Sequence, residues 1–287
     1  MSILANKIDF ALIISATNAN PNGDPLNGNR PRENFDGYGE ISDVCIKRKI
    51  RNRLQDMGEK VFVQSDDRCD DGCDSLRSRA ANCEALKKFS SGKNTNRDEY
   101  ANAACAEWID VRSFGQVFAF KGDSVSVGVR GPVSIHQAVS LSPVDIVSMQ
   151  ITKSVNSEGG KEGKSSDTMG MKHRVEFGLY LVKGSINCQL AEKTGFSDED
   201  AEKIKQALLT LFENDSSSAR PDGSMEVCRL YWWKHNCKMP AVSTAKVHRS
   251  LKIKENDPQK KPLSFEDYTV TLDEIPGGPV PEIYDLR

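Results

Sequence analysis

The sequence lacks the long apolar run that a membrane-spanning helix needs. None of its 287 residues lies in a stretch that approaches ~18 consecutive apolar side chains. The first residues are largely apolar, but Lys7 and Asp9 interrupt them, whereas the core of a secretory signal peptide is uncharged. These two absences predict a cytoplasmic protein.

The sequence also lacks the motifs of the common enzyme classes. Walker A and GxGxxG loops, the GxSxG elbow and the HExxH zinc motif are all missing. The four histidines, at positions 136, 173, 235 and 248, include no pair four residues apart. No two carboxylates have a spacing typical of acid–base catalysis, and the nearest candidates are Asp24 and Asp36. We therefore predict no catalytic residue, no cofactor and no bound metal, so not an enzyme.

The chain has little net charge, −2 from 39 basic and 41 acidic residues. A nucleic-acid-binding domain usually has a basic excess. Residues 47–53, however, contain five basic side chains in seven positions, and such a cluster on a near-neutral chain indicates an anionic partner. The alternative is a solvated helix whose basic side chains lie along the edges of an apolar stripe.

The eight cysteines raise the question of a zinc site. Four of them fall in one polar region, at Cys69, Cys73, Cys83 and Cys105. Structural zinc sites usually combine two short cysteine pairs, and this region has only one, of the CxxxC type. In a cytoplasmic protein we therefore expect reduced, free thiols. A zinc site at these four positions remains the alternative.

The first third of the chain predicts a central strand, a long loop and a helix. Residues 8–16 are apolar on both faces, as in a strand at the centre of a sheet. The following segment is rich in Asn, Gly and Pro, so we expect no regular element before residue 42. Residues 43–57 have helical apolar spacing, with Ser42 as the N-cap and Gly58 as the left-handed residue after the C-cap.

Two insertions are expected. Residues 59–124 are polar and contain two helix candidates, near 75–89 and 97–109. Residues 141–172 have two extended arms around a tip rich in Gly, Ser and Lys at 156–167, which predicts a protruding β-hairpin.

The remaining segments complete an α+β pattern. They are strands at 131–140, 174–187 and 226–235 and a helix at 197–215, capped by Ser197 with Asp200. The tail from Pro240 reads as mostly irregular, with one strand at 268–272. Without the insertions the order is β-α-β-β-α-β, that of a ferredoxin-like or RRM fold.

Two segments are candidates for binding RNA. The loop after the first strand offers the amide groups of Asn18, Asn20, Asn22 and Asn27, which suit phosphates or base edges; its alternative is an ordinary surface loop. The second candidate places Lys172, His173 and Arg174 together against a phosphate backbone. On the hairpin arms, Met149, Met169 and Met171 are expected either to wedge between bases or to pack between the arms.

Several unusual motifs resemble one family in particular. NPNGDP, DVCIKRKIRN, DVRSFGQVFA, GMKHRVEFGLY and DSSSARPDGSM occur in this order and resemble the RAMP-superfamily "Cas seven" backbone subunit of CRISPR Cascade, in its type I-C form. The resemblance implies a hand-shaped protein, with an RRM-like palm at 1–58, 125–140 and 173–287. Residues 59–124 would form helical fingers, and residues 141–172 would form the hairpin thumb.

The resemblance also implies a function in antiviral defence. Copies of the chain would line up head to tail along a CRISPR RNA and present its spacer to a target DNA strand. Other Cascade subunits, guide-processing, large and small, would be partners. The RNA-binding residues would be Asn20, Asn22, Lys47, Arg48, Arg51, Arg112, Lys172, His173 and Arg174, with the three methionines as the thumb wedge.

The same resemblance keeps two alternatives open. RNA-cleaving relatives in type III complexes use a loop aspartate, and Asp24 or Asp36 lies in a loop of equivalent appearance. A metal-dependent ribonuclease is therefore the second hypothesis, although the type I-C form is expected to be non-catalytic. A lone RNA-binding regulator that does not oligomerise is the third.

Overall fold

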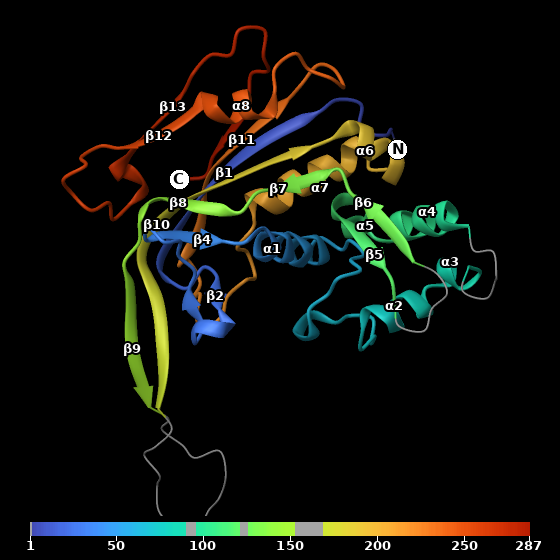
Figure 1. Cartoon of the computed structure of the whole chain (residues 1–287), viewed down its shortest axis with the longest axis horizontal. Helices are drawn as coiled ribbons and strands as arrows, with labels where there is room; N and C mark the ends of the chain where they lie inside the picture. Colours follow the sequence, from blue (N-terminus) through green and yellow to red (C-terminus); the bar gives the residue numbers. More distant parts are fainter. Residues whose placement is uncertain (1, 90–95, 121–125, 153–168) are drawn as a thin grey trace, which may run out of the picture.

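One large antiparallel sheet organises the molecule (Figure 1). The computed structural model describes residues 2–89, 96–120, 126–152 and 169–287. The sheet has eight strands, with β14-β11-β1-β10-β8-β4 side by side and β7 and β9 both paired with β10. Their bounds are β1 Ile8–Ala19, β4 Tyr38–Ile41, β7 Val133–Ile135, β8 Ala138–Pro143, β9 Ile146–Thr152, β10 Met169–Ile186, β11 Met225–Lys234 and β14 Glu282–Asp285.

The predicted central strand is confirmed as β1, which extends three residues further than expected, to Ala19. It pairs with β10 on one side and β11 on the other, so its backbone is satisfied along both edges. Phe10 and Leu12 face one hydrophobic cluster, and Ala11 and Ile13 face a second. Side chains alternate between the faces of a strand, so a strand buried on both faces is apolar throughout.

Helices cover the first face of the sheet. They are α1 Asp43–Asp56, α6 Cys188–Thr194 and α7 Asp198–Leu209, and their apolar residues join Phe10 and Leu12 in one core. The predicted caps are confirmed: the Ser42 side chain accepts a hydrogen bond from the Cys45 amide, and Gly58 has φ of 82°. Ser197 and Asp200 form the expected capping box at the start of α7. Helix α6 was not predicted.

The C-terminal tail covers the second face, and the expectation of a mostly irregular tail is wrong. It forms α8 Thr244–Ser250, β12 Leu251–Glu255 and the expected strand, β13 Tyr268–Leu272. Val247, Leu251 and Tyr268 pack against Ala11 and Ile13. Their polar neighbours hid this pattern, because burial here depends on contact with a strand more than 200 residues earlier in the chain.

The insertion has its own small core. Its elements are α2 Leu76–Asn82, α3 Glu84–Lys87, α4 Arg97–Glu107, α5 Ile109–Phe114, β5 Gly115–Phe118 and β6 Val127–Arg130. The single helix expected at 75–89 is broken at Cys83, which has an extended backbone. Phe62, Trp108 and Phe118 pack together, with ring centroids of Phe62 and Trp108 4.7 Å apart. Strand β6 contributes Val127 to this core, so it packs with the insertion rather than with the large sheet.

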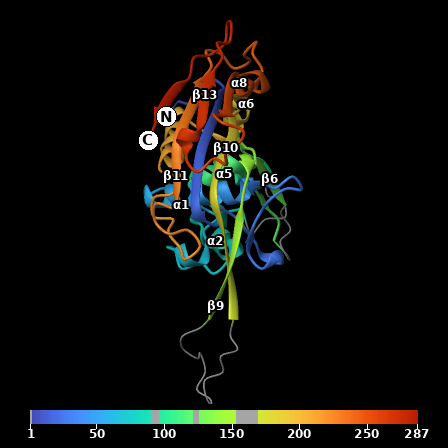
Figure 2. The ribbon, with the colours of Figure 1, turned by 90° about the vertical axis from the view of Figure 1, so that its left-hand side faces the viewer.

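The predicted hairpin is present and projects from the body as a narrow ribbon (Figures 1 and 2). Strand β10 runs without interruption from the hairpin into the sheet over 18 residues, so no boundary separates the two at residue 172. The expected tip at 156–167 lies outside the described residues. The strand expected at 131–140 is divided into β7 and β8, which both lie beside β10.

The long loop after β1 is more ordered than predicted. It contains the short ladder of β2 Gly23–Asp24 and β3 Arg30–Pro31, and the edge strand β4 joins the large sheet. In the described part of the chain, no helix is long and apolar enough to cross a membrane.

Candidate nucleic-acid interface

The hairpin has two different faces. In the β9–β10 register, Met149 lies opposite Lys172 and Val147 lies opposite Arg174. Residues directly opposite one another in an antiparallel pair share a face, and their neighbours along each strand point to the other face. One face therefore joins an apolar row on β9, continued by Ile151, to a cationic row on β10. We call it the mixed face.

The other face carries Met171 and His173. The His173 ring forms a hydrogen bond with Ser148 Oγ at 2.8 Å, and Arg30 Nη1 donates to the same oxygen at 3.1 Å. Arg30 belongs to β3, so this face turns toward the loop that follows β1. We call it the loop face.

Met149 and Met171 do not pack between the two arms. Met149 is 41% exposed and Met171 is 54% exposed, and they lie on opposite faces of a two-stranded ribbon. The backbone of Met169 pairs with Thr152. The alternation of a strand places His173 on the loop face and both Lys172 and Arg174 on the mixed face, so the three side chains do not share one face. That all three contact RNA stays a prediction.

The asparagines of the loop hold the loop itself. Asn20 is buried, and its amide donates to the Asn29 carbonyl at 2.6 Å. Asn22 Oδ1 accepts a hydrogen bond from the Ser42 amide at 2.9 Å and so joins the loop to the start of α1. A Cβ on Gly23 would lie 2.0 Å from Asn29 Oδ1, so glycine is required at this close approach.

The two candidate aspartates do not form a pair. Asp24 Oδ1 accepts from the Leu26 amide and lies 3.3 Å from Arg32 Nη2. Asp36 lies in a separate turn, where its own amide donates to Asn34 Oδ1. Within residues 2–89, 96–120, 126–152 and 169–287, no three or more His, Cys, Asp or Glu side chains form a group that could hold a metal ion.

Most of the basic side chains on α1 are already paired within the protein. Lys47 pairs with Asp43 at 2.9 Å, one turn earlier on the same helix. Lys49 is buried against Asp215 and above the Phe212 ring. The remaining three arginines pair as follows: Arg51 Nε with Asp110 at 2.9 Å, Arg53 Nη1 with Asp56 at 3.0 Å, and Arg48 Nη2 with Asp67 at 3.7 Å. Arg48 is the exception, because its side chain is 60% exposed and its ion pair is long.

Arg112 joins the insertion to α7. Its guanidinium makes two hydrogen bonds to the Asp200 carboxylate, at 2.8 and 3.1 Å, and donates to the Cys105 carbonyl. Burial opposes ionisation of Asp200, but the hydrogen bonds from Arg112 and Ser197 hold the pKa of Asp200 below its usual range. Arg112 is therefore held by one partner on α7, Asp200, and by another in the insertion, the Cys105 carbonyl.

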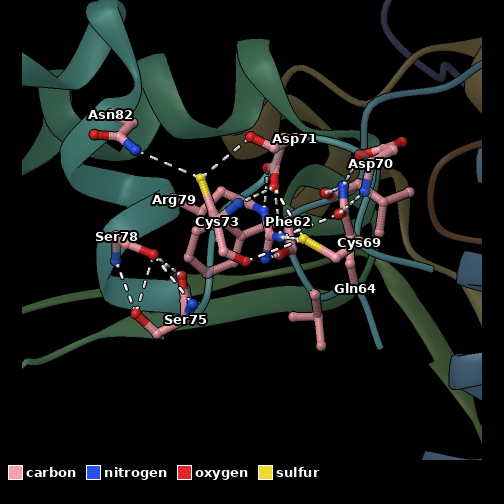
Figure 3. Close-up of polar contacts among 12 residues, drawn as sticks. Phe62, Gln64, Cys69, Asp70, Asp71, Cys73, Ser75, Ser78, Arg79 and Asn82 are labelled. Carbon is pink, nitrogen blue, oxygen red and sulfur yellow. Dashed lines mark hydrogen bonds and ion pairs between the residues drawn. The ribbon is translucent and has the colours of Figure 1, made fainter. Parts of the chain in front are cut away.

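An arginine, Arg79, holds the cysteine-rich loop through several hydrogen bonds (Figure 3). Arg79 is buried, forms an ion pair with Asp71 and donates to the Phe62 carbonyl at 2.9 Å. Cys69 and Cys73 flank Asp71, and the Cys69 thiol donates to the Cys73 carbonyl at 3.1 Å. Cys105 is buried in the insertion core, where burial raises its thiol pKa to about 11. All eight cysteines are free.

Comparison with known proteins identifies the family. The family model for "CRISPR-associated protein Cas7" matches residues 6–273. The chain belongs to the Cas7 family. A Cas7 relative from Haloferax volcanii, "CRISPR-associated protein Cas7", is 25% identical over 240 residues. That match covers 74% of this chain and 66% of the relative's length, so it leaves a third of the relative unmatched.

Chains of two solved structures also align with this chain. A chain of a "CRISPR RNA-guided surveillance complex, pre-nicking" aligns with a TM-score of 0.49 and 15% identity, covering 79% of this chain and 77% of that one. A chain of a "CRISPR RNA-guided surveillance complex" aligns with a TM-score of 0.46 and 15% identity, covering 79% and 68%.

Sequence reasoning missed three residues of the hairpin surface, Arg30, Ser148 and Ile151. The period of two along β9 and β10 was visible in the sequence and would have separated the two faces. The contact between Arg30 and Ser148 joins positions 118 residues apart, and no local pattern indicates it.

Proposed function

We propose that this chain is the guide-RNA-binding backbone subunit of a type I-C CRISPR surveillance complex. Copies would assemble head to tail along the spacer of the guide and present it for pairing with a target DNA strand. The mixed face of the hairpin carries the proposal. There, on a member of the Cas7 family, exposed apolar side chains lie beside Lys172 and Arg174, which no carboxylate of the described residues pairs. The type I-C assignment rests on the five sequence motifs.

The hairpin suits a wedge between two successive bases. A two-stranded ribbon inserted into a stacked strand would present Met149 to one base and Met171 to the other, since they lie on opposite faces. Inserted apolar side chains that unstack a nucleic acid need nearby cations to hold the displaced backbone. Lys172 and Arg174 on the mixed face would supply them. Neither pairs with a carboxylate in the part of the chain that the structure describes.

The large sheet would serve as an RRM-like palm. Strands β11, β1, β10 and β8 lie side by side, which places the last and first strands of the β-α-β-β-α-β order next to each other. A protruding hairpin that meets the next copy makes a heterologous contact, which repeats along a filament instead of closing into a dimer.

We propose fewer direct RNA contacts than the sequence resemblance implies. Arg48, Lys172, His173 and Arg174 are at least partly exposed and are kept as contacts. Lys47 is kept as well, because a surface pair such as Lys47–Asp43 is weak and a phosphate can replace the carboxylate. We assign four residues to holding the fold instead: Asn20, Asn22, Arg51 and Arg112.

We propose that the subunit is non-catalytic. Asp24 is held by Arg32 and the Leu26 amide, and Asp36 lies in a different turn, so the two do not converge on one metal site. Purified protein incubated with labelled RNA and Mg²⁺ or Mn²⁺ should leave the RNA intact. RNA cleavage that disappears in the Asp24→Ala or Asp36→Ala variant would favour the ribonuclease hypothesis instead.

Footprinting tests the wedge. With guide RNA bound, the wild-type chain should give periodic nuclease protection with hypersensitive positions at each wedge. The Met149→Ala/Met171→Ala variant should keep RNA affinity from its cations but lose the hypersensitive positions. As a matched control, Met239→Ala removes a methionine that is 78% exposed and lies outside the hairpin, and it should change nothing. Hypersensitive positions that persist without Met149 and Met171 would contradict the wedge.

A further inference from the structure

A second group of basic side chains lies around α8, at the end of the molecule opposite to the hairpin (Figure 1). It comprises His136, Lys183, Lys246 and Arg249, which we call the α8 patch. Three of the four side chains are exposed, and Lys183 is half-buried. Within the described ranges, none of the four side chains forms an ion pair or a hydrogen bond with a carboxylate.

Contacts from the buried His248 show that these segments converge. His248 Nε2 lies 3.1 Å from the Gly184 carbonyl, directly after Lys183. The His136 amide donates to the Lys183 carbonyl at 2.8 Å, and the rings of His136 and His248 lie 6.0 Å apart, edge to face. Lys246 and Arg249 are separated by three residues on α8, so they lie on the same side of that helix.

Asp9, a carboxylate on this face of the sheet, does not neutralise the patch. Asp9 lies opposite Ser185, two residues along β10 from Lys183, and points to the same side of the sheet. It is fully buried and already occupied by His235 at 2.8 Å and by Lys7 at 3.5 Å. Basic side chains that no described carboxylate neutralises attract anions.

The chemistry of the patch favours a phosphate backbone over a protein partner. Protein interfaces are anchored by buried aromatic or aliphatic side chains. Helix α8 has none to offer, because Val247, its one large apolar residue, packs inside against the sheet. Basic side chains gathered from three segments, with no apolar anchor beside them on α8, are typical of contacts to phosphodiester groups.

We propose that the α8 patch binds the phosphodiester backbone of a nucleic acid, as a second contact distinct from the guide-binding hairpin. That the bound anion is a nucleic acid rests on the proposed function. That the patch binds an anion does not depend on it. The strand or duplex involved is either RNA or DNA, which share this backbone chemistry.

Salt-dependent binding of the full-length chain tests the proposal. Duplex DNA and single-stranded RNA of equal length are titrated separately, with the protein alone and after loading with guide RNA. The variant Lys246→Ala/Arg249→Ala removes two patch cations. In at least one of the two titrations, its slope of log affinity against log salt should fall by about two, and the titration that changes identifies the nucleic acid. Charge-preserving Lys246→Arg/Arg249→Lys should retain the wild-type slope.

Two controls distinguish loss of the α8 patch from a general loss of positive charge and from a failure to assemble. Lys87→Ala/Lys88→Ala removes the same charge from exposed positions on the insertion and should leave duplex binding unchanged. Guide-dependent assembly, followed by mass, should be normal in the α8 variant. If slopes for both nucleic acids equal the wild type, or if the insertion variant loses as much, the proposal is overturned. Failure of the wild type to assemble on guide RNA would contradict the proposed function, while the slopes still decide the patch.

Discussion

Substituting Arg112 by alanine separates its two proposed roles, holding the fold or contacting RNA. Arg112 and Asp200 form a bidentate pair in which the side chains are only 16% and 4% exposed. Without the guanidinium, the Asp200 carboxylate stays buried with Ser197 as its remaining partner. Removing one member of a buried pair usually costs about 3–5 kcal/mol of unfolding free energy. Because Ser197 still donates two hydrogen bonds, we expect about 3 kcal/mol.

Urea unfolding followed by tryptophan fluorescence measures this loss. Arg48→Ala is the matched control, because Arg48 is also basic and its side chain is 60% exposed. Its unfolding free energy should change by no more than about 0.5 kcal/mol, while its RNA affinity falls. Arg112→Ala should do the reverse, losing stability but keeping the RNA affinity of the fraction that remains folded. An Arg112→Ala protein of normal stability and weakened RNA binding would refute the structural role.

Three further outcomes follow from the described contacts. The Lys172→Ala/Arg174→Ala variant should lower the salt slope of RNA binding by about two without changing the urea midpoint, as titration at several salt concentrations would show; an unchanged slope would remove the mixed face from the interface. Gly184→Ala should lower the unfolding free energy by about 1–3 kcal/mol, because its Cβ would lie 2.1 Å from the Phe10 ring, and wild-type stability would contradict that packing. The pKa of Asp200 is held below its usual 3.8, so its contribution to stability is complete above that pH and is lost as pH falls below it. Acid unfolding should therefore depend on this pair, and an unchanged acid transition in Arg112→Ala would contradict the linkage.

The parts of the fold that the sequence predicts are those with local causes. The strand at β1 is apolar on both faces, and the caps at Ser42 and Ser197 follow from side chains within three residues of the amides that they satisfy. The C-terminal elements could not be predicted in this way. Val247 and Tyr268 become core residues only because they meet β1, which is distant in the chain.

The candidate site likewise has some features with local causes and others that depend on distant parts of the chain. The hairpin arms follow from the sequence pattern, and strand alternation separates their two faces. The sequence leaves open whether the methionines are exposed or packed between the arms. The fate of the basic residues does not, because Arg51 is paired with Asp110 and Arg112 with Asp200, partners 59 and 88 residues away. A cation that such a partner neutralises looks the same in the sequence as one that is free to bind RNA.

Native mass spectrometry of the chain with guide RNAs of increasing length tests the central claim most directly. A backbone subunit predicts that the number of bound chains rises in proportion to RNA length, with the RNA recovered intact in Mg²⁺. Deleting the hairpin from Val147 to Met169 should leave a folded monomer that no longer adds in regular steps. One bound chain per RNA at every length, or cleaved RNA, would contradict the account.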